Sequence, residues 1–267
     1  MSTITDTGSA ARQGRLWSAR TDDWVEAMEP HMQGVFEQSL DAVGVTAGTR
    51  LLDVGCGAGL ALRLAADRGA DVSGLDAAEG MVTHARRRVP GAPVVQGEIE
   101  QLPYADTSFD VVTGFNSFQY ATRPAAALAE AARVVRPGGR VLALVWGPAE
   151  LCQGAAYLAA LGRLMPPPPP GAPGPFALSS EDALTDLLRG AGLEGVTIAD
   201  APAQWRYADQ DAALRGMLAS GPVIVAVEHS GDDAVRAAAI EAIAPFRGDD
   251  GGFVISNVFR YAIGTRP

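Results

Sequence analysis

The sequence predicts an α/β fold built on a doubly wound, mostly parallel sheet of seven strands. Between residues 50 and 146, short apolar runs alternate with segments of helical periodicity, and this alternation is typical of βαβ units. The first run leads directly into a glycine-rich turn at the start of a helix. The chain has 267 residues, of which 48% are hydrophobic, so it is long enough to bury a substantial core.

Five strands and three helices are expected in this first part. The apolar runs that predict the strands are 50–54, 71–76, 93–97, 109–115 and 140–146. The first helix, 60–68, is expected to end at Gly69, where a positive φ is needed. The second ends before Pro90, and the third begins at Pro124, whose fixed φ suits a first helical turn.

The remaining segments complete the sheet and add helices outside it. Residues 15–43 are expected to be helical, with mostly core residues on one apolar face. The segment 165–175 contains seven prolines, which favours a stiff polyproline II connection. Three further helices are predicted at 180–190, 209–219 and 232–246, and two strands at 195–207 and 253–263, so that two helices precede an antiparallel last strand.

Composition excludes several classes of function. With 31 acidic and 21 basic residues the formal charge is −10, which argues against nucleic-acid binding. Every basic residue is Arg, so chemistry that requires a lysine, such as Schiff-base formation, is excluded. Cys56 and Cys152 are too few for a disulfide framework. Without an apolar run of about 18 residues or an apolar signal core near the first residue, a cytoplasmic protein without membrane contact is expected.

Polar groups at three predicted strand ends indicate a nucleoside-binding edge. The first strand runs through Asp53 into the turn Gly55–Gly59, where the absent Cβ atoms let a ligand approach the backbone. The third glycine comes one place too early for the dinucleotide fingerprint, which argues against NAD and FAD. Asp76, after the second strand, can accept both ribose hydroxyls. Glu98 and Ile99, after the third, can meet an adenine amine and a ring nitrogen.

These motifs together resemble those of a known enzyme family. The segments LLDVGCGAG, GEIEQLP, SFDVVTGFNSFQY and RPGGRVLALVW resemble the class I S-adenosylmethionine-dependent methyltransferases, which have a Rossmann-like fold. Within that family the sequence is similar to the small-molecule branch related to ubiquinone and menaquinone methyltransferases. The resemblance covers about residues 45–147.

The resemblance implies a set of residues for S-adenosylmethionine, with S-adenosylhomocysteine as the product. Asp53 and the turn hold the methionine end, Asp76 the ribose, Met81 an adenine face and Glu98 with Ile99 the adenine edge, while Asn116 lies near the sulfonium. Trp24 is a candidate for covering the sulfonium by a cation–π contact, as is Trp17. The predicted cofactor residues are Trp24, Asp53, Gly55, Cys56, Gly57, Gly59, Asp76, Ala77, Met81, Glu98, Ile99 and Asn116.

Candidates for catalysis are fewer, because a sulfonium already carries an activated methyl group and alignment does most of the work. His31, His229 and Tyr120 are the candidates for supplying a base or orienting a substrate, although each is also compatible with a structural role. Cys56 is expected to fill space against the cofactor rather than act as a nucleophile. The scattered histidines and unpaired carboxylates predict no metal site.

We therefore expect a single domain over residues 1–267. An N-terminal helical cover (1–48) precedes the cofactor-binding core (49–147), and the C-terminal half (148–267) carries lid helices at about 209–247. The predicted activity is methyl transfer to a small, apolar or aromatic metabolite, because the lid sequence is rich in Ala, Val, Ile and Met. The alternatives are a cofactor-binding scaffold that does not methylate, acting as a cyclisation or rearrangement catalyst or as a partner subunit, and an NAD-dependent oxidoreductase. The oligomeric state is left open.

Overall fold

One seven-stranded sheet forms the centre of the protein. The structure, a computed structural model, describes residues 8–168 and 174–267. Its strands follow the order β3-β2-β1-β4-β5-β7-β6, and β7 runs antiparallel to both β5 and β6, which flank it. The predicted fold class and the antiparallel last strand are therefore confirmed. The strands are β1 (Arg50–Val54), β2 (Asp71–Asp76), β3 (Val94–Gln96), β4 (Phe109–Phe115), β5 (Val135–Trp146), β6 (Glu194–Tyr207) and β7 (Phe253–Thr265).

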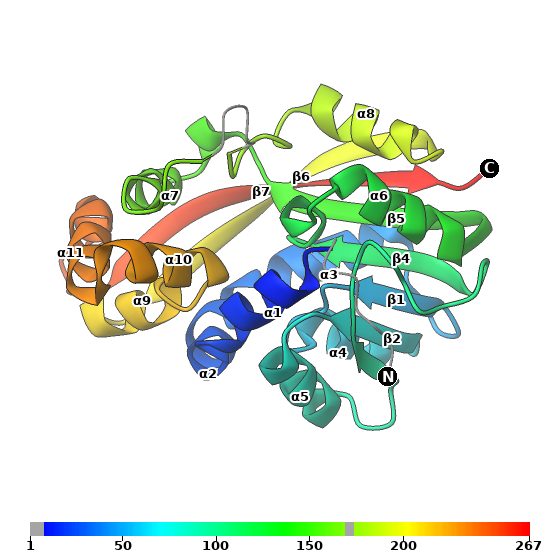
Figure 1. Cartoon of the computed structure of the whole chain (residues 1–267), viewed down its shortest axis with the longest axis horizontal. Helices are drawn as coiled ribbons and strands as arrows, with labels where there is room; N and C mark the ends of the chain where they lie inside the picture. The colour runs from blue at the N-terminus through cyan, green and yellow to red at the C-terminus, as the bar shows by residue number, and fades with distance from the viewer. Residues whose placement is uncertain (1–7, 169–173) are drawn as a thin grey trace.

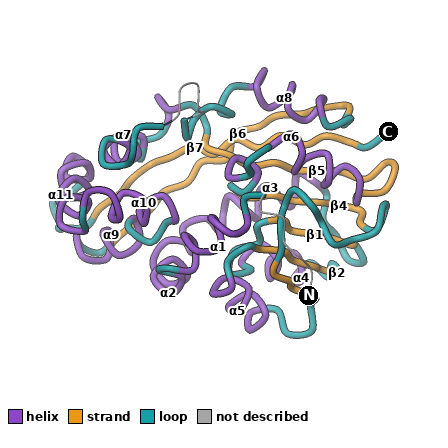
Figure 2. The backbone as a smooth tube through the Cα atoms, in the orientation of Figure 1, coloured by secondary structure: helices purple, strands orange, loops and turns teal. Residues whose placement is uncertain are grey.

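Helices cover both faces of the sheet, as Figures 1 and 2 show. On one face lie α3 (Gln33–Val43), α4 (Leu60–Asp67) and α5 (Glu79–Arg88), and on the other α6 (Pro124–Val134) and α8 (Glu181–Gly190). Each face has its own buried apolar cluster, one centred on residues such as Leu51 and Leu62, the other on Leu52 and Leu128. This two-sided burial explains why the inner strands are continuous apolar runs.

The N-terminal cover is less regular than the single helical stretch expected over 15–43. It begins with α1 (Ala10–Ser18) and the short α2 (Thr21–Asp23), continues as a π-helix, η1 (Trp24–Met28), and a 3-10 helix, η2 (Glu29–Met32), and ends in α3. Pro30 lies within the 3-10 segment, where a proline ring is incompatible with an undisturbed α-helix. The helical prediction was correct in outline and wrong about continuity.

Helices beyond one end of the sheet occupy the segment that was predicted to be a lid. Three helices separate β6 from β7, where two were expected: α9 (Gln210–Met217), α10 (Gly221–Ser230) and α11 (Asp232–Ile243), the last followed by the 3-10 turn η5 (Ala244–Phe246). A further unpredicted helix, α7 (Ala155–Gly162), packs against α11. Two short 3-10 turns, η3 (Phe118–Tyr120) and η4 (Ala149–Leu151), follow β4 and β5.

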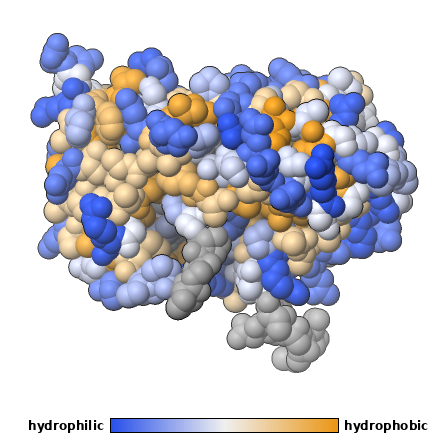
Figure 3. All heavy atoms as spheres, turned by 90° about the horizontal axis from the view of Figure 1, so that it is seen from above, coloured by the Kyte–Doolittle hydropathy of each residue, from blue (hydrophilic) through white to orange (hydrophobic). Residues whose placement is uncertain are grey.

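The lid side of the molecule has a mildly apolar surface. In the space-filling view, pale apolar colours spread over the left part of the face shown, the side on which α7 and α11 lie in Figure 1 (Figure 3). Alanines make up much of both helices. Within the described part of the chain, no helix is long and apolar enough to cross a membrane. The centre of the predicted proline-rich connection, residues 169–173, lies outside the described residues.

Candidate active site

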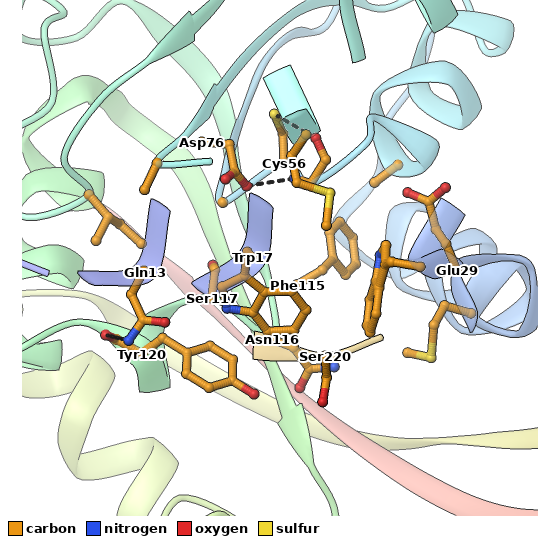
Figure 4. Close-up of a pocket in the computed structure, with 18 of the residues that line it drawn as sticks. Gln13, Trp17, Glu29, Cys56, Asp76, Phe115, Asn116, Ser117, Tyr120 and Ser220 are labelled. Atoms are coloured by element: carbon orange, nitrogen blue, oxygen red, sulfur yellow. Dashed lines mark hydrogen bonds between the residues drawn. The ribbon is translucent and has the colours of Figure 1, made fainter. Parts of the chain in front are cut away.

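A cavity lies at the carboxyl ends of the parallel strands, between the sheet, the N-terminal cover and the lid (Figure 4). Parallel strands end at one edge of the sheet, and ligands bind there in doubly wound folds. Of the predicted cofactor residues, all but Gly59 line this cavity: Trp24, Asp53, Gly55, Cys56, Gly57, Asp76, Ala77, Met81, Glu98, Ile99 and Asn116. The chain fold thus brings together residues from β1, β2, β4 and the segment after β3.

The turn after β1 exposes its backbone to this cavity. Gly55, Gly57 and Gly59 all have positive φ, at 72°, 53° and 83°, a conformation that L side chains rarely adopt. A Cβ on Gly57 would meet no atom within 4 Å, whereas one on Gly59 would lie 3.0 Å from Ala85 of α5. Gly57 therefore faces open space beside the cavity, and Gly59 serves the packing of α4 against α5 instead of lining the site.

Asp76 joins the end of β2 to the glycine turn. Its Oδ2 accepts a hydrogen bond from the backbone N–H of Gly57 at 2.8 Å, and its Oδ1 accepts one from Ala78 at 2.8 Å. Burial raises the pKa of this carboxyl, and the backbone donors of Ala78, Gly57 and Ala77 oppose that rise. One side chain thus fixes the turn and lines the cavity beside it.

Asp53 lies on β1 opposite Thr113 of β4, its partner in the parallel register. The Thr113 hydroxyl donates to Asp53 Oδ1 at 2.7 Å. Burial raises the pKa of Asp53 to about 7, and the nearby negative charge of Asp76 acts in the same direction, while the Thr113 hydroxyl acts against it. A buried carboxylate in such surroundings is stabilised by an approaching cation.

The segment after β4 carries a strained residue. Asn116 has φ of 51°, and its Oδ1 accepts a hydrogen bond from Gln119 Nε2 at 3.0 Å. Asparagine tolerates left-handed backbone better than most residues, and such conformations gather at functional sites. Ser117 also lines the cavity, and its buried Oγ has no hydrogen-bond partner among the described residues. No pattern in the sequence singles out Ser117 as a site residue.

Glu98 lines the cavity and also contacts the N-terminal cover. Its Oε2 accepts a hydrogen bond from the backbone N–H of Ala10 at 2.7 Å, and its Oε1 accepts one from the Ser9 hydroxyl at 3.2 Å. The carboxylate therefore meets the first turn of α1, where unpaired N–H groups favour a negative charge. The sequence placed Glu98 opposite an adenine, whereas in this structure two of its contacts are with the N-terminal cover.

Aromatic residues of the cover close over the glycine turn. Trp17 and Trp24 pack edge to face, with ring centroids 5.0 Å apart, and Trp17 lies 5.6 Å from Tyr120. Both tryptophans pack on Met81 and its buried neighbours. In Figure 4 the Trp17 indole lies between Asp76 and Cys56 on one side and Tyr120 and Ser220 on the other. Burial raises the pKa of Tyr120 to about 12, so its hydroxyl is a hydrogen-bond donor at neutral pH.

The apolar face of the N-terminal cover was expected to consist mostly of core residues. In the structure this face also forms part of the cavity wall. Trp17, Trp24, Met28, Met32 and Phe36 all line the cavity. Met28 and Met32 belong to the buried core cluster as well. Helical spacing identifies a buried face but does not distinguish packing against protein from packing against a ligand.

The two candidate histidines lie elsewhere. The His31 ring packs edge to face on Tyr207, with centroids 4.7 Å apart, and burial lowers its pKa. His229 lies in the last turn of α10. Neither residue lines the cavity, and no histidine or arginine is among the described residues that do. This placement gives no support to a catalytic role for His31 or His229.

Glu29 is a cavity residue that the sequence reasoning missed. It is 5% exposed and forms an ion pair with Arg88 of α5. Burial raises its pKa, which Arg88 and the backbone N–H of Leu60 oppose. The sequence pattern that could have identified Glu29 is the presence of an acidic residue on an otherwise apolar face of the cover. Arg88 thus pairs with a buried carboxylate at the edge of the cavity.

Beyond the glycine turn the cavity continues into what we call the apolar chamber. Its walls come from β4, β5, β6 and β7 and from α3, α7, α9 and α10. The chamber residues are Phe36, Phe115, Trp146, Tyr157, Leu158, Trp205, Met217, Pro222 and Phe259. Trp146 packs on Phe259 and Trp205 with centroid distances of 4.8 and 5.7 Å. None of these side chains carries a charge, so the chamber suits an uncharged, apolar molecule.

Comparisons with known proteins agree with this geometry. Residues 52–143 match a family described as "Methyltransferase domain". A demethylmenaquinone methyltransferase of Renibacterium salmoninarum is 42% identical over 103 residues, which are 39% of this chain and 44% of the relative. Residues 52–143 therefore belong to a methyltransferase domain. The match spans less than half the length of that curated relative.

Solved structures resemble the methyltransferase domain together with its surroundings. A Haloferax volcanii protein solved in complex with the Trm112 methyltransferase activator aligns over 97% of each chain with a TM-score of 0.59 and 23% identity. The [4+2]-cyclase SpnF aligns over 88% of this chain and 80% of its own, with a TM-score of 0.54 and 20% identity. At such identities the likeness shows the fold alone.

The residues present fit S-adenosylmethionine, the cofactor of this class. The open face of Gly57 gives a ligand direct access to backbone. Asp53 and Asp76 place two carboxyl groups beside it, whose charged forms a bound cation would favour. No cationic side chain lines the cavity in residues 8–168 and 174–267. That charge balance suits a sulfonium and an ammonium group better than it suits the phosphates of a dinucleotide.

Proposed function

We propose that this protein transfers a methyl group from S-adenosylmethionine to a small, uncharged, apolar or aromatic metabolite. The observation that carries the proposal is the continuity of one cavity from the glycine turn to the apolar chamber. A cofactor on the turn and an acceptor in the chamber would share that space, with Asn116 and Tyr120 between them. Their juxtaposition is what an in-line displacement requires.

The chain's own residues would divide the work of binding. Asp76 would accept the ribose hydroxyls, and Asp53 with the turn from Gly55 to Gly57 would hold the methionine end. Met81, Ala77 and Ile99 would enclose the adenine. These roles follow from the side chains that line the cavity on the β1 and β2 side and from the charge-assisted bonds that carboxylates form.

Alignment and exclusion of water would supply most of the rate. The bound cofactor supplies an activated methyl group on a sulfonium. Trp17, Trp24 and the lid enclose the site, and positioning of this kind is worth roughly 7–11 kcal/mol. The Tyr120 hydroxyl, neutral because burial raises its pKa to about 12, would donate a hydrogen bond that orients the acceptor. An acceptor that needs a base would have to rely on its own acidity or on a carboxylate of the site.

One observation also favours a second class of reaction, cyclisation without methyl transfer. Among the described residues the cavity contains no histidine, and an enclosed apolar chamber could also hold a substrate that cyclises without methyl transfer. A cyclase has the same fold, although that likeness is limited to the fold. Fold does not determine the reaction, so the test must measure binding and transfer separately.

The experiment is calorimetric titration with S-adenosylmethionine and S-adenosylhomocysteine, followed by incubation with methyl-labelled cofactor and a panel of aromatic acceptors. Binding with label in an uncharged product supports the proposal. Binding with label only in highly charged acceptors contradicts the proposed substrate class. Binding with conversion of a substrate but no label supports the cyclase class, and absence of cofactor binding overturns both.

A further inference from the structure

Two buried nitrogen donors near the apolar chamber have no acceptor. Trp205, 5% exposed, and Asn257, 2% exposed, carry Nε1 and Nδ2 atoms without a hydrogen-bond partner among the described residues. Buried donors are nearly always paired with protein, water or ligand. Their occurrence together therefore needs an explanation beyond packing.

Both donors belong to the same patch of the sheet. Across the β6–β7 pair, Ala203 is opposite Asn257 and Trp205 is opposite Ile255, and opposed residues share a face. The Asn257 Oδ1 already accepts a hydrogen bond from the Gly154 N–H at 2.8 Å, which fixes the amide. Its free Nδ2 and the Trp205 indole thus lie on the face that also carries Phe259.

Trp146 connects this patch to the chamber. Its ring lies 5.7 Å from that of Trp205, and a Cβ on Gly154 would come 3.6 Å from both the Trp146 ring and Asn257 Cγ. Trp146, Trp205 and Phe259 all line the cavity. The wall farthest along the sheet from Glu98 is therefore aromatic, uncharged and short of hydrogen-bond acceptors.

The carboxylates of the cavity do not supply those acceptors. Asp53 is bonded to Thr113, Asp76 to Gly57 and Ala78, Glu98 to Ala10, and Glu29 is paired with Arg88. Each carboxylate already has a partner, and none of them has a hydrogen bond to Trp205 or Asn257 among the described contacts. The cavity carboxylates therefore leave these two donors available to a molecule that enters the chamber, whether water or substrate.

We infer that Trp205 is a specificity-determining residue. Its indole N–H donates a hydrogen bond to a carbonyl or ether oxygen on an uncharged, planar substrate. Trp146 and Phe259 would hold the ring system by aromatic contact, and Asn257 would position or supplement the donor. A hydrocarbon of the same shape would leave the N–H unpaired and bind less well. This inference rests on the proposed function, because it assigns the chamber to the methyl acceptor.

The test uses a matched pair of ligands, 1-tetralone and tetralin, which share a bicyclic frame and differ in one carbonyl oxygen. Each is titrated calorimetrically into the full chain saturated with S-adenosylhomocysteine. Trp205→Phe should lower the ratio of tetralone to tetralin affinity about 10-fold. Trp146→Phe, which removes another indole from the same chamber, should weaken both ligands without changing that ratio.

A measurement on the unaltered protein covers the case in which Trp205→Phe does not fold. The chain has 4 tryptophans, so its indole ¹H–¹⁵N spectrum contains few resonances. One indole proton should move downfield with tetralone and not with tetralin. The absence of a carbonyl-dependent shift, an unchanged ratio in Trp205→Phe, or no binding of either ligand overturns the inference. Retained S-adenosylhomocysteine binding in those cases leaves the proposed cofactor site standing.

Discussion

Glu98 accepts a hydrogen bond from the backbone N–H of Ala10 across 2.7 Å, which joins the segment after β3 to the first turn of α1. The two residues are 88 positions apart in the chain. Through this contact the N-terminal cover is attached to the same edge that holds the predicted cofactor residues. Glu98 thus contributes to holding α1 against this edge of the sheet.

The first prediction concerns this contact. Glu98→Ala removes the acceptor for Ala10 and Ser9, and a charge-assisted hydrogen bond contributes about 1.5–3 kcal/mol. We expect α1 to detach at least 10-fold more often, which makes the peptide bonds after the already exposed Arg12 and Arg15 accessible to trypsin. The rate of cleavage at these sites measures the effect.

Glu100→Ala is the matched control for that variant. Glu100 lies two residues away and binds Arg123, with no hydrogen bond to α1 among the described contacts. Its substitution should leave the cleavage rate at α1 unchanged. Equal rates in the Glu98 variant and the unaltered protein would contradict the attachment.

A second prediction tests the ribose assignment. Asp76→Ala should weaken S-adenosylmethionine binding by roughly 10- to 100-fold, the effect of losing a charge-assisted contact. Because Asp76 also accepts from Gly57 and Ala78, the melting temperature should fall as well. Asp76→Asn, which retains one oxygen acceptor, should recover part of both losses in calorimetry and thermal melting. An unchanged affinity for the cofactor would place the ribose elsewhere.

A third prediction distinguishes the roles of Gly57 and Gly59 in the turn. An alanine at either position costs about 1–2 kcal/mol of stability, because the backbone there is left-handed. Gly57→Ala adds a methyl group beside the cavity and should lower cofactor affinity more than stability, whereas Gly59→Ala presses on Ala85 and should lower stability more than affinity. Denaturant unfolding and calorimetry on both variants give the two quantities. If the loss of cofactor affinity relative to the loss of stability were the same in both variants, the separate roles of Gly57 and Gly59 would be contradicted.

Much of this turn and its surroundings could be predicted from the sequence. The bounds of β1, β2 and β4 match the expected runs residue by residue, because each is a buried apolar run that ends at a glycine or a polar residue. The strand ends then place Asp53 and Asp76 at one edge by topology alone. Local pattern and global fold agree here.

The lid and the chamber could not be predicted in the same way. The unexpected helices α7 and α10 are apolar around much of their circumference, as in AAYLAALG and GPVIVAVEHS, so no amphipathic period marks them. Trp146 and Trp205 read as ordinary strand residues, and only the tertiary fold shows that they line a cavity. The contact of Glu98 with Ala10 depends on how the cover folds back, which no local pattern records.

The fourth prediction is a pH dependence. Burial raises the pKa of Asp53 to about 7 from its ordinary 3.8. The folded protein therefore binds more protons than the unfolded chain between these values, and this group's contribution to stability is lost as the pH rises through 7. A cation beside Asp53 favours its charged form, so cofactor affinity should rise over the same range, with release of a proton on binding near pH 6.

Calorimetry at pH 6 in two buffers of different ionisation enthalpy measures the released proton. In Asp53→Asn, which leaves Asp76 unchanged, the part of the difference in binding enthalpy between the two buffers that comes from Asp53 should disappear. Its cofactor affinity should also depend less on pH. Equal proton release in the variant and the unaltered protein would assign the titration to another group.

The last prediction concerns the candidate catalytic residues. Tyr120 lines the cavity, whereas His31 packs on Tyr207 and His229 lies at the end of α10. Once an acceptor is known, Tyr120→Phe should lower kcat/KM about 10-fold by removing one orienting hydrogen bond, and His31→Gln and His229→Gln should change it less than 2-fold. A Tyr120 hydroxyl that only donates stays protonated up to about pH 12, so its loss should leave the shape of the pH–rate profile below pH 9 unaltered. A profile that changes shape in either histidine variant would instead restore that histidine as the base, acting from outside the cavity through water or movement of the lid.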